Sequence, residues 1–471
     1  MRIWENIKSL FLCFLIGLSI YLTGSLWFDN YQGLSLVLAN FPKNLRGTFI
    51  TEEVEYSQKY AESIVPYKLT IASPDNGKWM LYCDSPDVME AWNLVKVKFD
   101  HIGEKTEVIT GNISEWKDLI HRKSIILEFG NTVDVEILKL VLPNLIRINQ
   151  PDFNNINKLA VTKSIDGAVI YVDCKIEDKD LLYKILLKEE MADIENFIDG
   201  YIDKVADAKY VTLEETGTTK FYSERIIEPN TDVLFPISNK VNLRDYVKKL
   251  SIKEYFKQND AYSADHLAVQ IFQNTDYAKF ITGDNGTIYI NDDKSYVQID
   301  TDGLVEYINK GKLENTENVS PAIAYNMALD FIDMFHAYED IYLLSVKKSE
   351  DEYDFRFFLA ADGIPLISSK KIIEDDFRAI AQLKVKNGSI RYFKGKLIRY
   401  DLENLSSFVT NLTSGILNEL IPKIPEKQTM VVNCIQMSYD IDVLGGNYPI
   451  WYIEYKTENT HGNAMLKTTK N

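Results

Sequence analysis

The residues of this 471-residue sequence whose type most readily holds a metal ion are its five histidines. They are scattered singly, at His101, His121, His266, His336 and His461. No two of them have the i, i+4 spacing that turns two imidazoles toward one ion from one helix, and no H-E-x-x-H string occurs. The sequence therefore predicts no metal site.

Two Ser-x-x-Lys strings, Ser345–Lys348 and Ser368–Lys371, have the spacing that penicillin-binding enzymes use for a nucleophilic serine and its lysine. In those enzymes the serine begins a helix, and S-D-N and K-T-G elements stand nearby. Here the first string ends a predicted strand, the second lies in a predicted turn, and the companion elements are missing. We interpret both strings as chance occurrences.

One aspartate-rich stretch, Asp300-Thr301-Asp302-Gly303, resembles the opening of a calcium-binding loop. The twelfth position of such a loop would be Gly311 instead of the bidentate glutamate that calcium needs. The stretch is thus predicted to be a hairpin turn. Because G-x-S-x-G, P-loop and dinucleotide-binding glycine patterns are also missing, the sequence predicts a non-enzymatic protein without a cofactor.

Four cysteines are present, Cys13 in an apolar N-terminal run and Cys83, Cys174 and Cys434 in the rest of the chain. Three widely separated cysteines do not form a disulfide framework. We expect three free thiols, with one bridge among them left open.

The elements that must position these residues begin with Ser9–Phe28, twenty residues without a charge. As a helix this run would be ~30 Å long, which matches the hydrocarbon core of a bilayer. It is longer than the apolar region of a signal peptide and lacks an A-x-A cleavage site. Arg2 and Lys8 precede it and Asp29 follows it, so the positive-inside rule places residues 1–8 in the cytoplasm. The sequence predicts a single-pass cell-membrane protein whose bulk is extracytoplasmic.

One face of this anchor carries small residues. Ser9, Cys13 and Gly17 are spaced at i, i+4 and i+8, and Gly24 continues near the same face. Small residues at this spacing let a second membrane helix approach closely. These four residues are our candidate partner-packing face; the alternative is that glycine and serine are simply common in membrane helices.

The formal net charge is −17, from 52 Lys and Arg against 69 Asp and Glu. Nucleic-acid binding needs a surplus of basic residues to neutralise phosphates, so a nucleic-acid partner is excluded. The length predicts two or three domains, because one core rarely serves so many residues.

Hydrophobic periodicity predicts an α+β protein. Asp84-Ser85-Pro86 and Ser320-Pro321 mark helix starts, Asn387-Gly388 marks a hairpin turn, and helices are expected over residues 178–209 and 405–420. The predicted domains are a cytoplasmic N-terminus (1–8), an anchor (9–28), a juxtamembrane connector (29–67), an α/β domain (68–235), a central α+β module (236–318), a C-terminal α+β module (319–458) and a disordered tail (459–471). The two modules each read as a helix with an antiparallel meander.

Five segments carry a resemblance to a known family: Leu22–Asp29 in the anchor, Ala328–Asp333, Tyr353–Phe357, Ile380–Phe393 and Pro449–Trp451. Together with Trp4 and the basic N-terminus, they resemble the YycH family of Gram-positive bacteria and its companion YycI, to which the C-terminal module is similar. The motifs are packing patterns and carry no catalytic signature.

The resemblance implies an accessory regulator of the WalK–WalR (YycG–YycF) two-component system, which controls cell-wall metabolism. Its partners would be the membrane-embedded sensor histidine kinase and a single-pass YycI-like protein, contacted through the membrane helix and the ectodomain. No catalytic residues are implied. The alternatives are a wall-associated enzyme, an extracytoplasmic binding module, and an assembly scaffold with no kinase partner.

Overall fold

The computed structural model divides the chain into two compact units, Met1–Lys59 and Tyr60–Asn471, and the described residues all belong to the second. The anchor 9–28, most of the connector 29–67 and the residues Ser9, Cys13, Gly17 and Gly24 therefore lie outside the described residues. Within the part that is described, no helix is long and apolar enough to span a membrane. The described residues are 61–75, 77–103, 106–150, 152–176, 179–204, 210–212, 215, 226–228, 233–236, 240–244, 267–268, 271–272, 279–283, 286–290, 295–300, 302–311, 319–335, 341–349, 351–373, 376–398, 405–409, 415–416, 418, 422, 429–442, 449–457, 461–467 and 469–470.

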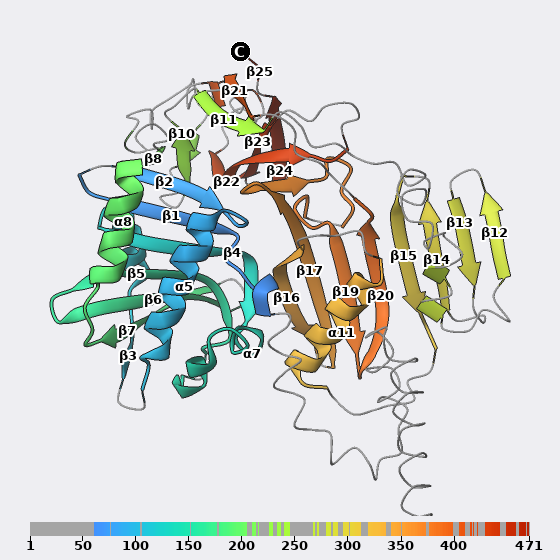
Figure 1. Ribbon diagram of the computed structural model, residues 1–471, viewed down its shortest axis with the longest axis horizontal. Helices are drawn as coiled ribbons and strands as arrows, with labels where there is room; N and C mark the ends of the chain where they lie inside the picture. The colour runs from blue at the N-terminus through green and yellow to red at the C-terminus, as the bar shows by residue number, and fades with distance from the viewer. Residues whose placement is uncertain are drawn as a thin grey trace, which may run out of the picture. The chain divides into compact units, whose positions relative to one another are not determined.

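The first sheet contains nine described strands, all paired antiparallel. They are β1 (Lys68–Ser73), β2 (Gly77–Tyr82), β3 (Glu107–Thr110), β4 (Ser124–Asp134), β5 (Asn155–Ser164), β6 (Gly167–Ile176), β7 (Lys179–Leu187), β8 (Tyr210–Thr212) and β10 (Leu234–Pro236). Their order across the sheet is β10-β8-β2-β1-β4-β5-β6-β7-β3, so β4 is the middle strand (Figure 1).

Helices cover both faces of this sheet, because its central strands are apolar on both sides. Residues Ile125 and Leu127 of β4 join the main core, whereas Ile126 between them joins a separate cluster around Trp116. In Figure 1 the main-core face is covered by α5 and α8. The helices and short 3-10 turns of this region are η2 (Ala61–Ser63), α5 (Pro86–Asp100), α6 (Ile113–Leu119), which carries Trp116, α7 (Val135–Leu138), η3 (Pro143–Arg147) and α8 (Ala192–Lys204).

The start of α5 is encoded locally, as the sequence predicts. Ser85 is the N-cap residue and Pro86 occupies the first helical position, where its missing N–H costs no hydrogen bond. Asp84 has a φ of 70°, and its carboxylate accepts hydrogen bonds from the Tyr342 hydroxyl at 3.2 Å and the Gly363 amide at 3.5 Å. The turn before the helix is thereby tied to residues far along the chain.

The second sheet contains thirteen described strands. They are β9 (Ile226–Glu228), β12 (Lys279–Gly283), β13 (Gly286–Ile290), β14 (Ser295–Asp300), β15 (Leu304–Asn309), β16 (Ile341–Ser349), β17 (Glu352–Ala361), β18 (Ile364–Ile367), β19 (Ala381–Lys386), β20 (Ser389–Lys396), β22 (Thr429–Asp440), β23 (Ile450–Thr457) and β24 (His461–Lys467). The main path runs β12-β13-β14-β15-β20-β19-β17-β18-β22-β23-β24; β16 pairs with β17, and β9 pairs with β22. A small third sheet joins β11 (Lys240–Arg244), β21 (Leu405–Val409) and β25 (Thr469–Lys470).

Strand pairing crosses the boundaries at 236 and 319 that the sequence suggests. β15 pairs with β20 through Tyr307 and Phe393, and β9 pairs in parallel with β22. Aromatic packing also joins these regions, since the ring centres of Phe393 and of Phe331 in α11 (Pro321–Asp333) are 5.4 Å apart. The sheets therefore connect the predicted central and C-terminal modules, and the stated boundaries stay predictions.

Two predictions from short sequence motifs, a helix start and a hairpin turn, are confirmed by the structure. Ser320 caps α11 by accepting a hydrogen bond from the Ile323 amide at 3.3 Å. Asn387 and Gly388 have φ values of 48° and 68° and link β19 to β20, which is the two-residue hairpin that their types favour. The structure is mixed helix and sheet, and mostly strands (Figure 1).

Three predicted segments differ from the structure. The expected helix over 178–209 is strand β7 followed by α8, because Tyr183, Ile185 and Leu187 are buried at a spacing of two. Residues 405–409 of an expected helix form β21. Residues of the expected disordered tail form β24, which pairs with β23 and buries Ala464 and Leu466. In each case pairing with a distant strand overrides the local pattern.

Candidate functional site

The histidines that the structure describes stand apart, each beside a carboxylate. His101 Nδ1 lies 2.5 Å from Glu189 Oε1, and His121 Nδ1 lies 3.8 Å from Glu215 Oε1. His266 and His336 lie outside the described residues, and only the backbone of His461 is described, in β24. Among the described side chains no group of three His, Cys, Asp or Glu could hold a metal ion.

The two Ser-x-x-Lys strings do not bring serine and lysine together. Ser345 and Lys348 are three residues apart in β16, so their side chains leave opposite faces of the strand. Ser368 Oγ donates to Asp442 Oδ2 at 2.5 Å, while Lys371 Nζ lies 4.8 Å from the centre of the Phe377 ring. Ser368 is also fully buried, which removes it from any substrate.

The aspartate-rich stretch forms the predicted hairpin turn. Asp300 Oδ1 accepts hydrogen bonds of 2.9 Å from the amides of both Asp302 and Leu304, and Gly303 has a φ of 85°. This carboxylate therefore closes the turn between β14 and β15.

Cys83, Cys174 and Cys434 are free thiols, which confirms the expectation from their spacing. Burial raises the pKa of both Cys83 and Cys174 well above the usual thiol range, and raises that of Cys434 to about 12. All three thiols are protonated at neutral pH and are poor nucleophiles.

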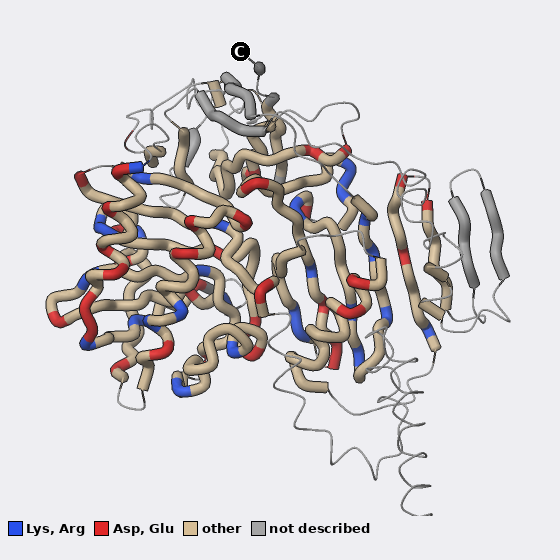
Figure 2. The backbone as a smooth tube through the Cα atoms, in the orientation of Figure 1, with Lys and Arg blue, Asp and Glu red and all other residues tan. Residues whose placement is uncertain are grey.

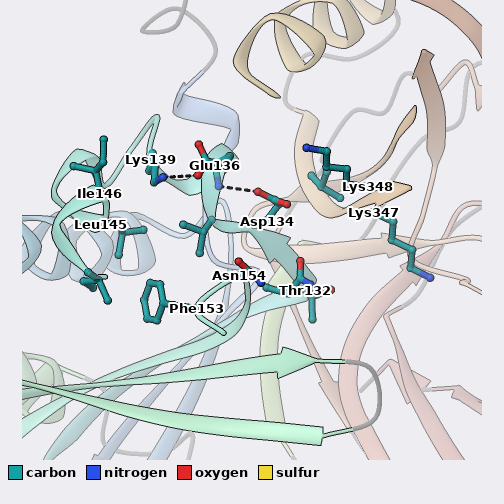
Figure 3. Close-up of a pocket in the computed structure, with 14 residues that line it drawn as sticks. Thr132, Asp134, Glu136, Lys139, Leu145, Ile146, Phe153, Asn154, Lys347 and Lys348 are labelled. Carbon is teal, nitrogen blue, oxygen red and sulfur yellow. Dashed lines mark hydrogen bonds and ion pairs between the residues drawn. The ribbon is translucent and has the colours of Figure 1, made fainter. Parts of the chain in front are cut away.

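One cavity among the described residues could hold a ligand. It has a volume of about 690 Å³ and lies between the end of β4, α7, η3 and the end of β16. Figure 3 shows Asp134 facing Lys348 across it, with Glu136 beside Asp134 and Lys139 on the far side of Glu136. This volume falls within the range of ligand sites in proteins, roughly 300–1,000 Å³.

Charged groups of both signs border this pocket. Asp134 Oδ1 accepts from the Glu136 amide at 2.7 Å, which caps α7, and Glu136 forms an ion pair with Lys139. Burial raises the pKa of Asp134 above its usual value, and the Lys348 and Lys139 ammonium groups oppose that shift. Figure 2 shows acidic and basic residues interspersed along the backbone of both sheets.

An apolar wall completes the pocket on the side of η3. Leu145 and Phe153 are buried there, and Ile146 keeps 70% of its surface exposed at the rim. A ligand with both charged and apolar groups is the kind that such a lining accommodates. Sequence reasoning missed this site because its two sides are about two hundred residues apart in the chain; the adjacent lysines Lys347 and Lys348 were the single local signal.

A second cluster of polar groups joins the two large sheets and is filled by side chains. The Tyr67 hydroxyl donates to Gln436 Oε1 at 2.7 Å, and the Tyr67 ring lies 4.8 Å from that of Phe358. The Arg378 guanidinium lies 5.6 Å from the Tyr67 ring centre and pairs with Asp376 at 3.0 Å. This cluster holds the sheets together and does not form a ligand site.

The described residues form a strand-rich, mixed helix-and-sheet protein with a polar pocket. No family model and no curated protein matches the sequence. Among solved structures, YycH from Bacillus subtilis is similar, with a TM-score of 0.53 at 12% identity over 86% of this chain and 97% of that chain.

Two further solved structures have lower similarity. They are an uncharacterized protein from Eubacterium rectale (TM-score 0.32, 14% identity, 57% of this chain and 91% of that chain) and the C-terminal domain of YpeB from Bacillus megaterium (TM-score 0.22, 12% identity, 47% and 98%). The similarity to the Bacillus subtilis structure shows that the fold is YycH-like.

Proposed function

We propose that this protein is a membrane-anchored, non-enzymatic regulator of a WalK-type (YycG-type) sensor histidine kinase that controls cell-wall metabolism. The observation that carries the proposal is the YycH-like fold, which extends over 86% of the chain. The sequence segments that resemble the YycH family point the same way. The serines of the two Ser-x-x-Lys strings are buried, and so are the thiols of Cys83 and Cys174. Buried groups of this kind cannot reach a substrate as nucleophiles, which supports a non-enzymatic role.

In this proposal residues 9–28 span the cell membrane, with residues 1–8 in the cytoplasm and the bulk of the chain outside it. Ser9, Cys13, Gly17 and Gly24 pack against a membrane helix of the kinase or of a YycI-like single-pass partner. No nucleic acid and no cofactor takes part.

The ectodomain acts by favouring one of two packing geometries of the membrane helices, since a regulator shifts an equilibrium only through contacts that differ between its states. The polar cluster around Tyr67 and Arg378 supports this role, because the Tyr67 hydroxyl bonds to Gln436 of β22 and thereby couples the two large sheets. A force on one sheet is thus transmitted to the other.

The experiment that tests the proposal is mild crosslinking in the native membrane, followed by purification of the full-length protein and mass spectrometry of its partners. Recovery of a sensor histidine kinase together with a second single-pass protein is the expected result. Recovery of wall-synthesis or wall-hydrolysis proteins without a kinase would contradict it.

The packing face has its own test. Replacing Gly17 and Gly24 by Leu should reduce recovery of the kinase about tenfold, because the larger side chains prevent close helix approach. Ser19→Leu is the matched control, since helical spacing places Ser19 away from this face. Equal recovery from the Gly17→Leu/Gly24→Leu variant and the control would remove the face from the mechanism.

The pocket favours a second candidate, an extracytoplasmic wall-associated binding module or scaffold with no kinase partner. Its mixed charged and apolar lining suits a ligand without requiring any kinase. Deletion of the protein separates the two candidates: a regulator changes the phosphorylation of the response regulator, and a binding module leaves it unchanged.

A further inference from the structure

The strand β16 has one open edge in the described structure. It pairs with β17 on one side, from Ile341 opposite Leu359 to Ser349 opposite Glu352. None of the other described strands is hydrogen-bonded along its second side. An open strand edge presents unpaired backbone amides and carbonyls, to which another extended segment can bond.

Part of this open edge lies against β4. Between Glu128 and Val133 the pairing of β4 with β5 is interrupted by a bulge. Gly130 in this bulge lies so close to Leu344 of β16 that an added Cβ would be 2.1 Å from Leu344 Cδ1. Further along, Asp134 and the residues 346–348 line the pocket together, and Lys347 and Lys348 are exposed there.

Three consecutive residues of β16, Val346, Lys347 and Lys348, line this pocket. Consecutive side chains of a strand point to opposite faces, so the pocket borders the strand's edge as well as its sides. Figure 3 shows the Lys347 and Lys348 side chains directed to opposite sides of the strand.

The chemistry of this edge selects what can pair with it. Lys347 and Lys348 are exposed. On the paired side of β16, Asp354 lies opposite Lys347 and the Tyr353 ring centre lies 5.4 Å from Lys348 Nζ. Across the pocket, Asp134 faces Lys348 (Figure 3). Lysines directly across from lysines repel, whereas acidic side chains across from them attract. The same lysines would repel those of a second copy of this protein, so two β16 edges do not pair with each other. At one end of the pocket Ile146 offers an exposed apolar side chain.

We propose that this pocket binds an extended peptide segment of a partner protein, which adds as a strand to the open edge of β16. The segment places acidic side chains across from Lys347 and Lys348 and an apolar side chain against Ile146. Backbone hydrogen bonds to β16 supply affinity, and the lysines and the apolar wall supply specificity. The inference deepens the proposed function and rests on it for the source of the segment, but the binding itself is tested without a kinase.

The test uses the purified full-length chain in a mild detergent and a displayed library of random eight-residue peptides. We expect enrichment of peptides with acidic residues at alternate or adjacent positions beside an apolar residue. A synthetic copy of the most enriched peptide, carrying a fluorophore, then gives the dissociation constant by anisotropy. The absence of enriched peptides, or enrichment of basic ones, would overturn the proposal.

Variants locate the binding. Lys347→Glu/Lys348→Glu should weaken the peptide about tenfold or more, because two attractions become repulsions. Ile146→Ser, a second variant at an exposed position, should also weaken it. Lys117→Glu is the matched control, an exposed lysine of α6 outside the pocket, and should leave binding unchanged. Equal binding by all variants would place the peptide elsewhere and overturn the proposal.

Hydrogen exchange distinguishes strand addition from binding through side chains alone. Bound peptide should slow exchange of the backbone amides of residues 346–348, since an added strand hydrogen-bonds to this edge. Binding without protection there would overturn strand addition in favour of a small anionic ligand site. If no kinase co-purifies, the proposed function is contradicted, but peptide binding at β16 is not affected. The two failures are therefore distinguishable.

Discussion

Lys396 and Asp442 form a buried ion pair, with Nζ 2.5 Å from Oδ1 and side chains that are 4% and 2% exposed. Asp442 Oδ2 also accepts hydrogen bonds from the Ser368 hydroxyl at 2.5 Å and the Lys370 amide at 2.9 Å. The pair thus joins the ends of β20 and β22 to the turn that follows β18. Its geometry determines how these strands respond to mutation and to acid.

Removing one member of the pair should destabilise the protein strongly. Asp442→Asn leaves the Lys396 ammonium buried without its counter-charge, which costs about 3 kcal/mol in the free energy of unfolding. Lys396→Met should have a similar effect. Urea denaturation of both single variants and the double variant measures the coupling between them, and additive effects would contradict the interaction.

The same pair predicts a loss of stability in acid. Although burial alone would raise the pKa of Asp442, the Lys396 and Ser368 hydrogen bonds and the Lys370 amide hold it below its usual value. Its stabilisation is therefore complete above the unfolded-state pKa of about 3.9 and is lost as the pH falls through the lower folded-state pKa. Unfolding curves at decreasing pH should show that the difference in unfolding free energy between wild type and Asp442→Asn becomes smaller below about pH 4. A difference in unfolding free energy that does not change with pH would contradict a lowered pKa of Asp442.

The contact between β4 and β16 depends on Gly130. In Gly130→Ala the new Cβ would lie 2.1 Å from Leu344 Cδ1, and the repacking should cost about 1–3 kcal/mol of unfolding free energy. Leu344→Ala in the same chain makes room for the new Cβ but loses a buried side chain, so the double variant should lose less stability than the sum of the two single losses. Gly200→Ala is the control: nothing lies within 4 Å of its Cβ in helix α8, so it should stabilise by about 0.5–1 kcal/mol. Thermal melts of these four variants (both single changes, the double variant and Gly200→Ala) test this, and a neutral Gly130→Ala would mean that the contact is loose.

The thiols should be inert in the folded protein. Burial raises the pKa of Cys83 and Cys174, so iodoacetamide should modify neither at pH 8 without denaturant and both in urea. Peptide mass spectrometry reads each site separately. Rapid native alkylation of Cys83 or Cys174 would show that its surroundings open more easily than the packing indicates.

Sequence reasoning succeeded where short-range rules act. Ser320-Pro321 began a helix and Asn387-Gly388 formed a hairpin because capping, proline geometry and positive φ involve neighbours only. It failed at residues 179–187, where charged residues among leucines resembled a helix. Pairing of β7 with both β6 and β3 decides that segment, and neither pairing is visible locally.

The amino-acid sequence by itself determined the uncharged run Ser9–Phe28, the acidic charge, the mixture of helix and strand, and the missing catalytic patterns, since each follows from composition or spacing along the chain. Only the tertiary structure decided which strands pair, that Lys396 meets Asp442, and that residues of β4 and β16 line one pocket. These contacts join residues tens to hundreds of positions apart. Loop closure and packing select them from many alternatives that local propensity does not distinguish.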